Sequence, residues 1–318
     1  IGPAFRLLDV YPWISRGASD IYELSYGLLM PKLILFQFSS SSFSLEACML
    51  YLQNLQLILV LFLGGAIWLR TRSFIWLVIM LIALLFFDPA SIWIYHPNHT
   101  AWRYLGVGFS FFVLSIACFR GVRLQPYLKA LLGANAFIIN YETGLVIIVA
   151  LFLSELLSQK LKPSRIIIFT GTVIAGIFVA SIFIADTSPT VLLPLLFEYI
   201  LKMIWGNGQS GLGGEQYNVI PVFAIIVLHC SIVVWRTAFS RIKSPKQDFD
   251  LIASLFCLGW SMYFINRPGI TYLAVILIIY IFLFVRIKQD FNWAFRGVHQ
   301  DCVIGLLVLC SFVFFNQF

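Results

Sequence analysis

The residues best suited to chemistry are three carboxylates that precede the first long apolar run, Asp9, Asp20 and Glu23. A carboxylate can act as the general base that removes a proton from a hydroxyl nucleophile, and it can also bind a divalent cation. Asp20 and Glu23 are three residues apart, so a helix would place both on one face. The same spacing is that of a helix N-terminal capping box, in which both side chains bond only the local backbone. Both interpretations stay open, and Asp9 is a second candidate for the base.

Three more charged residues lie between apolar runs. Arg267, in the turn Asn266-Arg-Pro-Gly269, and Arg103 each carry a guanidinium that can hold a phosphate through two hydrogen bonds. The alternative is that each anchors a helix end at a membrane interface. Glu142, in the turn Asn140-Tyr-Glu-Thr-Gly144, is either a site carboxylate or a negative charge that stabilises a helix N-terminus.

Other polar residues give weaker signals. His96 and His99 have a spacing seen in metal sites, but no third ligand follows at a typical spacing. His229 lies inside an apolar run, as a pigment ligand or, more simply, as a hydrogen-bonded structural histidine. Asp248-Phe-Asp250 resembles the metal-binding DxD of nucleotide-sugar transferases, but we expect it in a short loop without a nucleotide fold. No metal ligands are assigned, and a divalent cation stays open as a cofactor.

The composition indicates a membrane protein. Of the 318 residues 61% are hydrophobic and only 11% are charged, whereas soluble domains carry about 25% charged residues. The apolar runs are continuous rather than alternating, which favours transmembrane helices over a β-barrel. The net charge of +7 comes from basic residues at the ends of these runs, so it does not indicate a nucleic-acid partner.

The expected architecture is an all-α, polytopic transmembrane helix bundle with amphipathic helices in its external loops. Residues 1–46 form an external loop with an interfacial helix, and residues 47–318 form the bundle, with a second external loop at 186–218. Because the chain does not begin with Met, one more span is expected upstream of Ile1. Ten apolar segments are predicted to cross the membrane: Ala47–Leu69, Ser73–Phe87, Tyr104–Phe119, Tyr127–Ile139, Thr143–Leu157, Ile166–Ala185, Val219–Trp235, Leu251–Phe264, Ile270–Val285 and Cys302–Phe315.

The distribution of charge predicts the orientation. With Ile1–Glu46 on one side, fifteen of the 21 Lys and Arg residues fall on the other side, which is therefore expected to be cytoplasmic. Nine of the 14 acidic residues fall on the external side with Ile1–Glu46. If Tyr127–Leu157 crossed the membrane only once, Lys160, Lys162 and Arg165 would lie outside. The count of Lys and Arg residues therefore requires two short crossings that meet at Asn140-Tyr-Glu142. The predicted location is the plasma membrane, in multi-pass form.

Several segments resemble the external loops of GT-C-type membrane glycosyltransferases of bacteria. They are Ile1-Gly-Pro-Ala-Phe-Arg-Leu-Leu8, Asp20-Ile-Tyr-Glu-Leu-Ser-Tyr-Gly-Leu-Leu-Met-Pro31, Asn140-Tyr-Glu-Thr-Gly144 and Asn266-Arg-Pro-Gly269.

The resemblance implies transfer of a sugar from a polyprenyl-phosphate donor to an acceptor on the outer face of the membrane. It implies a bacterial inner membrane with Ile1–Glu46 in the periplasm, and membrane lipid as a partner. The catalytic candidates are then Asp20, Asp9 and Glu23, and the substrate-binding candidates are Arg267, Arg103, Glu142 and Tyr26.

Two other functions remain open. The high aromatic content, 17%, and the lone histidine in an apolar run also fit a non-enzymatic subunit that packs or holds a cofactor in a complex with other membrane proteins. A transporter or flippase would carry ionisable groups deep inside its spans. Apart from His229 and Glu155 the predicted spans contain almost none, so this function ranks last.

Overall fold

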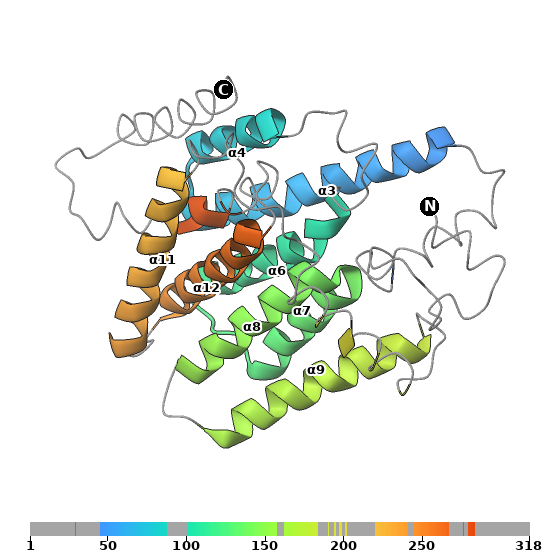
Figure 1. The fold of residues 1–318 in the computed structure, drawn as a ribbon. Coiled ribbons are helices and arrows are strands. Elements are labelled where there is room, and N and C mark those ends of the chain that lie inside the picture. The colour runs from blue at the N-terminus through green and yellow to red at the C-terminus, as the bar shows by residue number, and fades with distance from the viewer. Residues whose placement is uncertain are drawn as a thin grey trace.

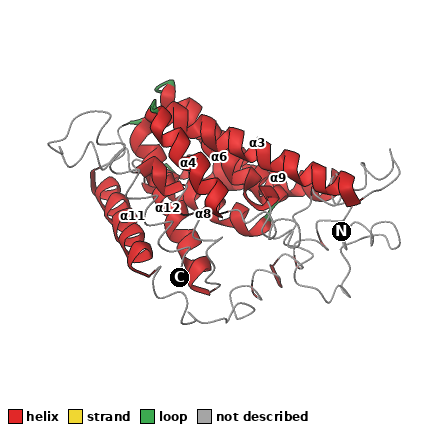
Figure 2. Ribbon diagram, turned by 90° about the horizontal axis from the view of Figure 1, so that it is seen from above, coloured by secondary structure: helices red, strands yellow, loops and turns green. Residues whose placement is uncertain are grey.

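The computed structural model describes residues 45–87, 101–157, 162–183, 220–240 and 244–266, with positions 29, 190, 194, 197, 198, 201, 276 and 279–283. Within these residues the secondary structure is helical and contains no strand, which confirms the all-α prediction (Figure 2). The long helices are α3 (Leu45–Thr71), α4 (Phe74–Phe87), α6 (Ala101–Phe119), α7 (Pro126–Ile139), α8 (Tyr141–Leu157), α9 (Pro163–Phe183), α11 (Ile220–Ser240) and α12 (Pro245–Asn266).

Three of these helices are long and apolar enough to cross a membrane, through the windows Asn54–Thr71, Trp102–Phe119 and Pro163–Ala180. Eighteen residues of helix span about 27 Å, close to the thickness of a bilayer core. Only 17% of the window in α9 is buried inside the protein. Its exposed side chains include Ile167 and Ile174. Such a continuous apolar face requires lipid or another protein as its neighbour.

The helices pack around α6 (Figure 1). Helix α3 packs along α6 and also contacts α4, while the pair α7 and α8 packs on α6 and α12. Helix α9 lies against α7, and α11 lies against α12 at the other edge. The central position of α6 agrees with its burial, since 72% of its apolar window is buried.

Aromatic rings fill the contact between α6 and α12. The ring of Phe111 lies 5.7 Å from that of Phe256 and 5.8 Å from that of Phe249, both edge to face, and it stacks on Phe282 at 5.6 Å between centroids. Edge-to-face and offset-stacked contacts at this distance add stabilisation beyond the burial of apolar area. This core fixes the relative positions of α6, which carries Arg103, and α12, which carries Asp248 and Asp250.

Helices α7 and α8 form a hairpin with a single residue between them. Asn140 is extended (φ −151°, ψ 124°), and its Oδ1 accepts a hydrogen bond from the N–H of Thr143 at 3.0 Å, which caps α8. A Cβ on Gly144 would lie 2.2 Å from the Cα of Phe137, so only glycine permits this close approach. The turn predicted at Asn140-Tyr-Glu142 is therefore present.

Helix α12 begins earlier than the apolar pattern predicts, and the prediction of a loop at Asp248-Phe-Asp250 is wrong. The N–H of Gln247 donates to Ser244 Oγ at 3.2 Å, and the N–H of Ser244 donates to Gln247 Oε1 at 3.3 Å. This reciprocal capping box, followed by Pro245 at the first helical position, starts the helix before the apolar run. Asp248 and Asp250 are consequently helical and buried.

Eight of the ten predicted apolar segments coincide with these helices. Ile270–Val285 is described only at 276 and 279–283, and Cys302–Phe315 lies outside the described residues. The same is true of residues 1–46 apart from Leu29 and the start of α3, and of most of the loop 186–218.

Candidate functional site

Two of the predicted substrate-binding residues, Arg103 and Glu142, form an ion pair. Arg103 lies in the first turn of α6 and Glu142 in the first turn of α8. Thr143 brings these helix starts together, because its Oγ1 donates a hydrogen bond to the backbone carbonyl of Arg103 at 2.7 Å. The side chains of Arg103 and Glu142 are only 2% and 7% exposed, so the pair is almost completely removed from solvent.

Aromatic residues surround this pair. The guanidinium of Arg103 lies 5.3 Å from the ring centroid of Trp260, within the range of a cation–π interaction. Trp260 in turn packs edge to face on Tyr104 at 5.9 Å. Trp102 donates its indole N–H to the carbonyl of Ile139 at 2.8 Å, which ties α6 to the end of α7. We call Arg103, Glu142 and Trp260 the Arg103 cluster.

The Arg103 cluster combines a cation, a carboxylate and an aromatic face. Since Glu142 is paired with Arg103, it is better suited to orient the guanidinium than to remove a proton from a substrate. A planar guanidinium held in this way can bind a phosphate. The other predicted site residues, Asp9, Asp20, Glu23, Tyr26 and Arg267, lie outside the described residues.

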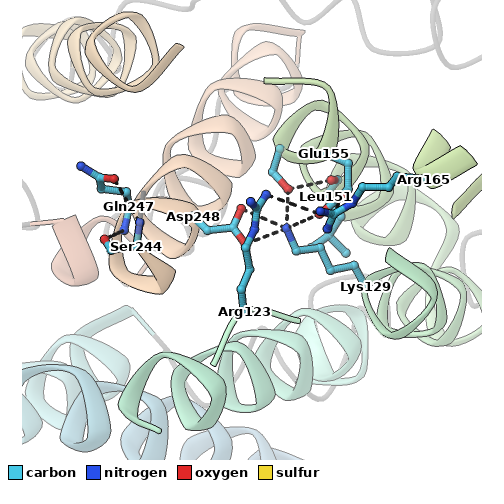
Figure 3. A network of polar contacts seen from close by, with 9 residues as sticks. Arg123, Lys129, Leu151, Glu155, Arg165, Ser244, Gln247 and Asp248 are labelled. Atoms are coloured by element: carbon cyan, nitrogen blue, oxygen red, sulfur yellow. Dashed lines mark hydrogen bonds and ion pairs between the residues drawn. The ribbon is translucent and has the colours of Figure 1, made fainter. Parts of the chain in front are cut away.

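A second group of charged residues lies at the other end of the bundle, where α7 and α12 begin and α8 ends. Figure 3 shows this group. Its centre is Lys129 of α7, whose side chain is 0% exposed. The ammonium nitrogen lies 2.7 Å from Asp248 Oδ2, 2.8 Å from Glu155 Oε1 and 3.0 Å from Ser154 Oγ. Lys129 donates hydrogen bonds to Ser154 and Asp248 and forms an ion pair with Glu155, so its ammonium group joins α7, α8 and α12.

Two arginines complete this group. Arg123 Nε lies 3.4 Å from Asp248 Oδ2, and its Nη2 lies 3.8 Å from Glu155 Oε1. Arg165, near the start of α9, approaches the other oxygen of Glu155 at 3.0 Å. We call Arg123, Lys129, Glu155, Arg165 and Asp248 the Lys129 cluster; it links four helices and the α6–α7 loop (Figure 3).

A neighbouring ion pair joins the end of α3 to the start of α12. Arg70 Nη2 donates to Asp250 Oδ1 at 2.6 Å, and both side chains are at most 5% exposed. In a double-mutant cycle with Arg70→Met and Asp250→Leu, we expect each single change to destabilise the protein and the double change to recover part of the loss. Removing one partner leaves the other charge buried and uncompensated, whereas removing both does not. Thermal unfolding of the four purified proteins measures this; additive losses would contradict the pairing.

The Lys129 cluster was not predicted from the sequence. Lys129 is one of the fifteen basic residues counted on the expected cytoplasmic side, and Glu155 is an ionisable group in a predicted span without an assigned partner. A signal was present, however, because only five of the 14 acidic residues fall on that side and three of them, Glu155, Asp248 and Asp250, are paired here.

The two clusters lie at opposite ends of one bundle. Glu142 and Glu155 belong to the same helix, α8, and are thirteen residues apart, which corresponds to about 20 Å along its axis. In the described part of the chain no group of three His, Cys, Asp or Glu residues could hold a metal ion. The carboxylates of Asp248-Phe-Asp250 are instead engaged by Lys129, Arg123 and Arg70.

The histidine of α11 has a hydrogen-bond partner. His229 Nδ1 lies 2.9 Å from the hydroxyl of Tyr280, and the two rings pack edge to face at 5.5 Å. The hydrogen-bonded histidine that the sequence favours over a pigment ligand is thus present. His96 and His99 lie outside the described residues.

Comparison of the chain with protein-family models, with curated proteins and with solved structures gave no match in any of the three.

Proposed function

We propose that this chain is an integral membrane glycosyltransferase that moves a sugar from a polyprenyl-phosphate donor to an acceptor on the outer face of a bacterial plasma membrane. The observation that carries the proposal is the pairing of Arg103 with Glu142 beside Trp260. The two charged residues belong to different segments of the sequence, and each was a candidate for substrate binding by itself. A buried guanidinium that is oriented by a carboxylate and flanked by an aromatic ring suits a glycosyl phosphate.

The distribution of charge along the helices supports an outward site. Arg70, Arg123, Lys129 and Arg165 meet at the end of the bundle that carries the Lys129 cluster, and the Arg103 cluster lies at the other end. Basic residues favour the cytoplasmic side of a membrane protein. We therefore propose that the Lys129 cluster faces the cytoplasm, that the Arg103 cluster faces outward, and that the full chain crosses the membrane ten times or more.

In the proposed reaction the acceptor hydroxyl attacks the anomeric carbon of the donor sugar. The bond between that carbon and the phosphate oxygen breaks, and polyprenyl phosphate leaves with its negative charge. Asp20 or Asp9 takes the proton of the hydroxyl, with Glu23 beside it, and Arg103 and Arg267 stabilise the charge on the leaving phosphate. We assign the sugar contact to Tyr26, and we assign to the buried Trp260 the role of holding the Arg103 guanidinium.

The experiment that tests this function uses the full chain in liposomes with a panel of radiolabelled polyprenyl-phosphate hexoses and pentoses. Asp9→Asn and Asp20→Asn remove one candidate base each without changing its shape. Loss of a general base is expected to lower the transfer rate about 10²- to 10⁴-fold. One of the two variants should show this loss while the other stays near the wild-type rate. Wild-type rates in both would eliminate these residues as the base.

A further inference from the structure

The Lys129 cluster contains more positive than negative charge. Among its described residues, Arg123, Lys129 and Arg165 are cationic and only Glu155 and Asp248 are anionic, so the formal charge is +1. Arg70 and Asp250 next to it neutralise each other. A charge in a largely desolvated cluster is costly unless an opposite charge compensates it. The cluster therefore favours one further anion.

The excess charge is on the outer rim of the cluster. The side chains of Lys129 and Glu155 are 0% exposed, whereas those of Arg123 and Arg165 are 17% and 26% exposed. Because Lys129 is fully buried against Asp248, Glu155 and Ser154, the two partly exposed arginines are the groups that another ligand can reach. Lys162, which is exposed just before α9, adds a further positive charge at this rim.

The arginines also retain unused donors. Within the described part of the chain, Nη1 and Nη2 of Arg123 and Nε of Arg165 make no hydrogen bond although all three atoms are buried. Both guanidinium groups approach the same carboxylate, that of Glu155: Arg123 from the α6–α7 loop and Arg165 from α9. A buried donor without a partner is unfavourable, because it has lost its hydrogen bonds to water. The two guanidinium groups therefore lie beside one carboxylate, and three of their N–H groups lack a hydrogen-bond acceptor in the described part of the chain.

We propose that Arg123 and Arg165 bind a phosphate group at the rim of the Lys129 cluster. Phosphate offers several oxygens to two planar guanidinium groups and carries the negative charge that the cluster requires. The group belongs either to an anionic lipid of the same membrane or to a free phosphate compound. This site lies at the opposite end of the bundle from the Arg103 cluster and does not depend on the proposed transferase activity.

The test measures the thermal unfolding of the detergent-solubilised full chain during titration with inorganic phosphate and, separately, with dioctanoyl phosphatidylglycerol. Potassium chloride at equal ionic strength and dioctanoyl phosphatidylcholine are the reference titrations. We expect phosphate, phosphatidylglycerol or both to raise Tm in a saturable manner. A rise in Tm with phosphatidylglycerol alone identifies the ligand as an anionic lipid. A rise in Tm with inorganic phosphate shows that a free phosphate compound is sufficient for binding. No response to either overturns the proposal.

Variants locate the site. Arg123→Gln and Arg165→Gln should each weaken binding about tenfold or more, since each removes charge-assisted hydrogen bonds. Arg120→Gln is the matched control: it removes the same charge from an exposed residue just outside the cluster, and binding should persist. If the Gln variants do not fold, Arg123→Lys and Arg165→Lys retain the charge but lose the planar donors, and should also bind less tightly. Unchanged affinity in variants that fold contradicts the proposal.

Discussion

Replacing Lys129 with Met is expected to lower the free energy of unfolding by about 3–5 kcal/mol, the cost of breaking a buried ion pair from one side. Met retains the length and much of the volume of the lysine stem. The change removes the ammonium group that lies within 3 Å of both Glu155 and Asp248, and so leaves two buried carboxylates that Lys129 no longer compensates. Chemical denaturation of the purified chain in mild detergent would measure the loss.

Lys162→Met is the control for this change. Lys162 lies at the same end of the bundle but is exposed, so its replacement should alter stability by less than about 0.5 kcal/mol. If Lys129→Met were equally mild, Lys129 would not be the centre of the cluster.

Replacing Gly144 with Ala is expected to cost more than about 2 kcal/mol of stability, because overpacking against backbone cannot be relieved by a rotamer change. The new Cβ would lie 2.2 Å from Phe137 Cα and 2.4 Å from Phe137 N, so α7 and α8 would have to separate at their shared turn. That movement would also shift Glu142 away from Arg103. We expect lower Tm and, in the transfer assay, lower activity.

Gly171→Ala provides the comparison, since a Cβ on Gly171 in α9 meets nothing within 4 Å. Ala is the better helix former by about 1 kcal/mol, so this variant should be unchanged or slightly more stable. Equal effects of the two substitutions would mean that α7 and α8 do not approach each other as described.

The sequence predicts the helices well because apolar runs and capping residues act locally. The turn at Asn140 was predicted for a different reason, namely that a single crossing from Tyr127 to Leu157 would have placed the later basic residues on the external side. In the structure the turn is made by the Asn140 cap and by the contact of Gly144 with Phe137. The count of charged residues thus predicted the turn correctly, although the turn itself is caused by local packing.

The pairing of charged residues could not be predicted in the same way. Lys129 and Asp248 are 119 positions apart, and Arg70 and Asp250 are 180 apart, so their contacts depend on how the helices pack. The predicted start of α12 is too late because the apolar pattern begins only at Leu251. The helix begins earlier, at the capping box of Ser244 and Gln247. Arg103 and Glu142 were identified separately, but their contact requires the α7–α8 hairpin to lie against α6.

The most direct test of the proposed function is the transfer assay with Arg103→Gln and with Arg120→Gln as the charge-matched control. Arg103→Gln should raise KM for the polyprenyl-phosphate donor about 10- to 100-fold, the effect of losing one charge-assisted interaction with phosphate. It should also lower Tm, because it leaves Glu142 buried without its partner. Arg120→Gln should have wild-type kinetics. A folded Arg103→Gln protein with unchanged KM and kcat would contradict the assignment of the Arg103 cluster to the donor phosphate.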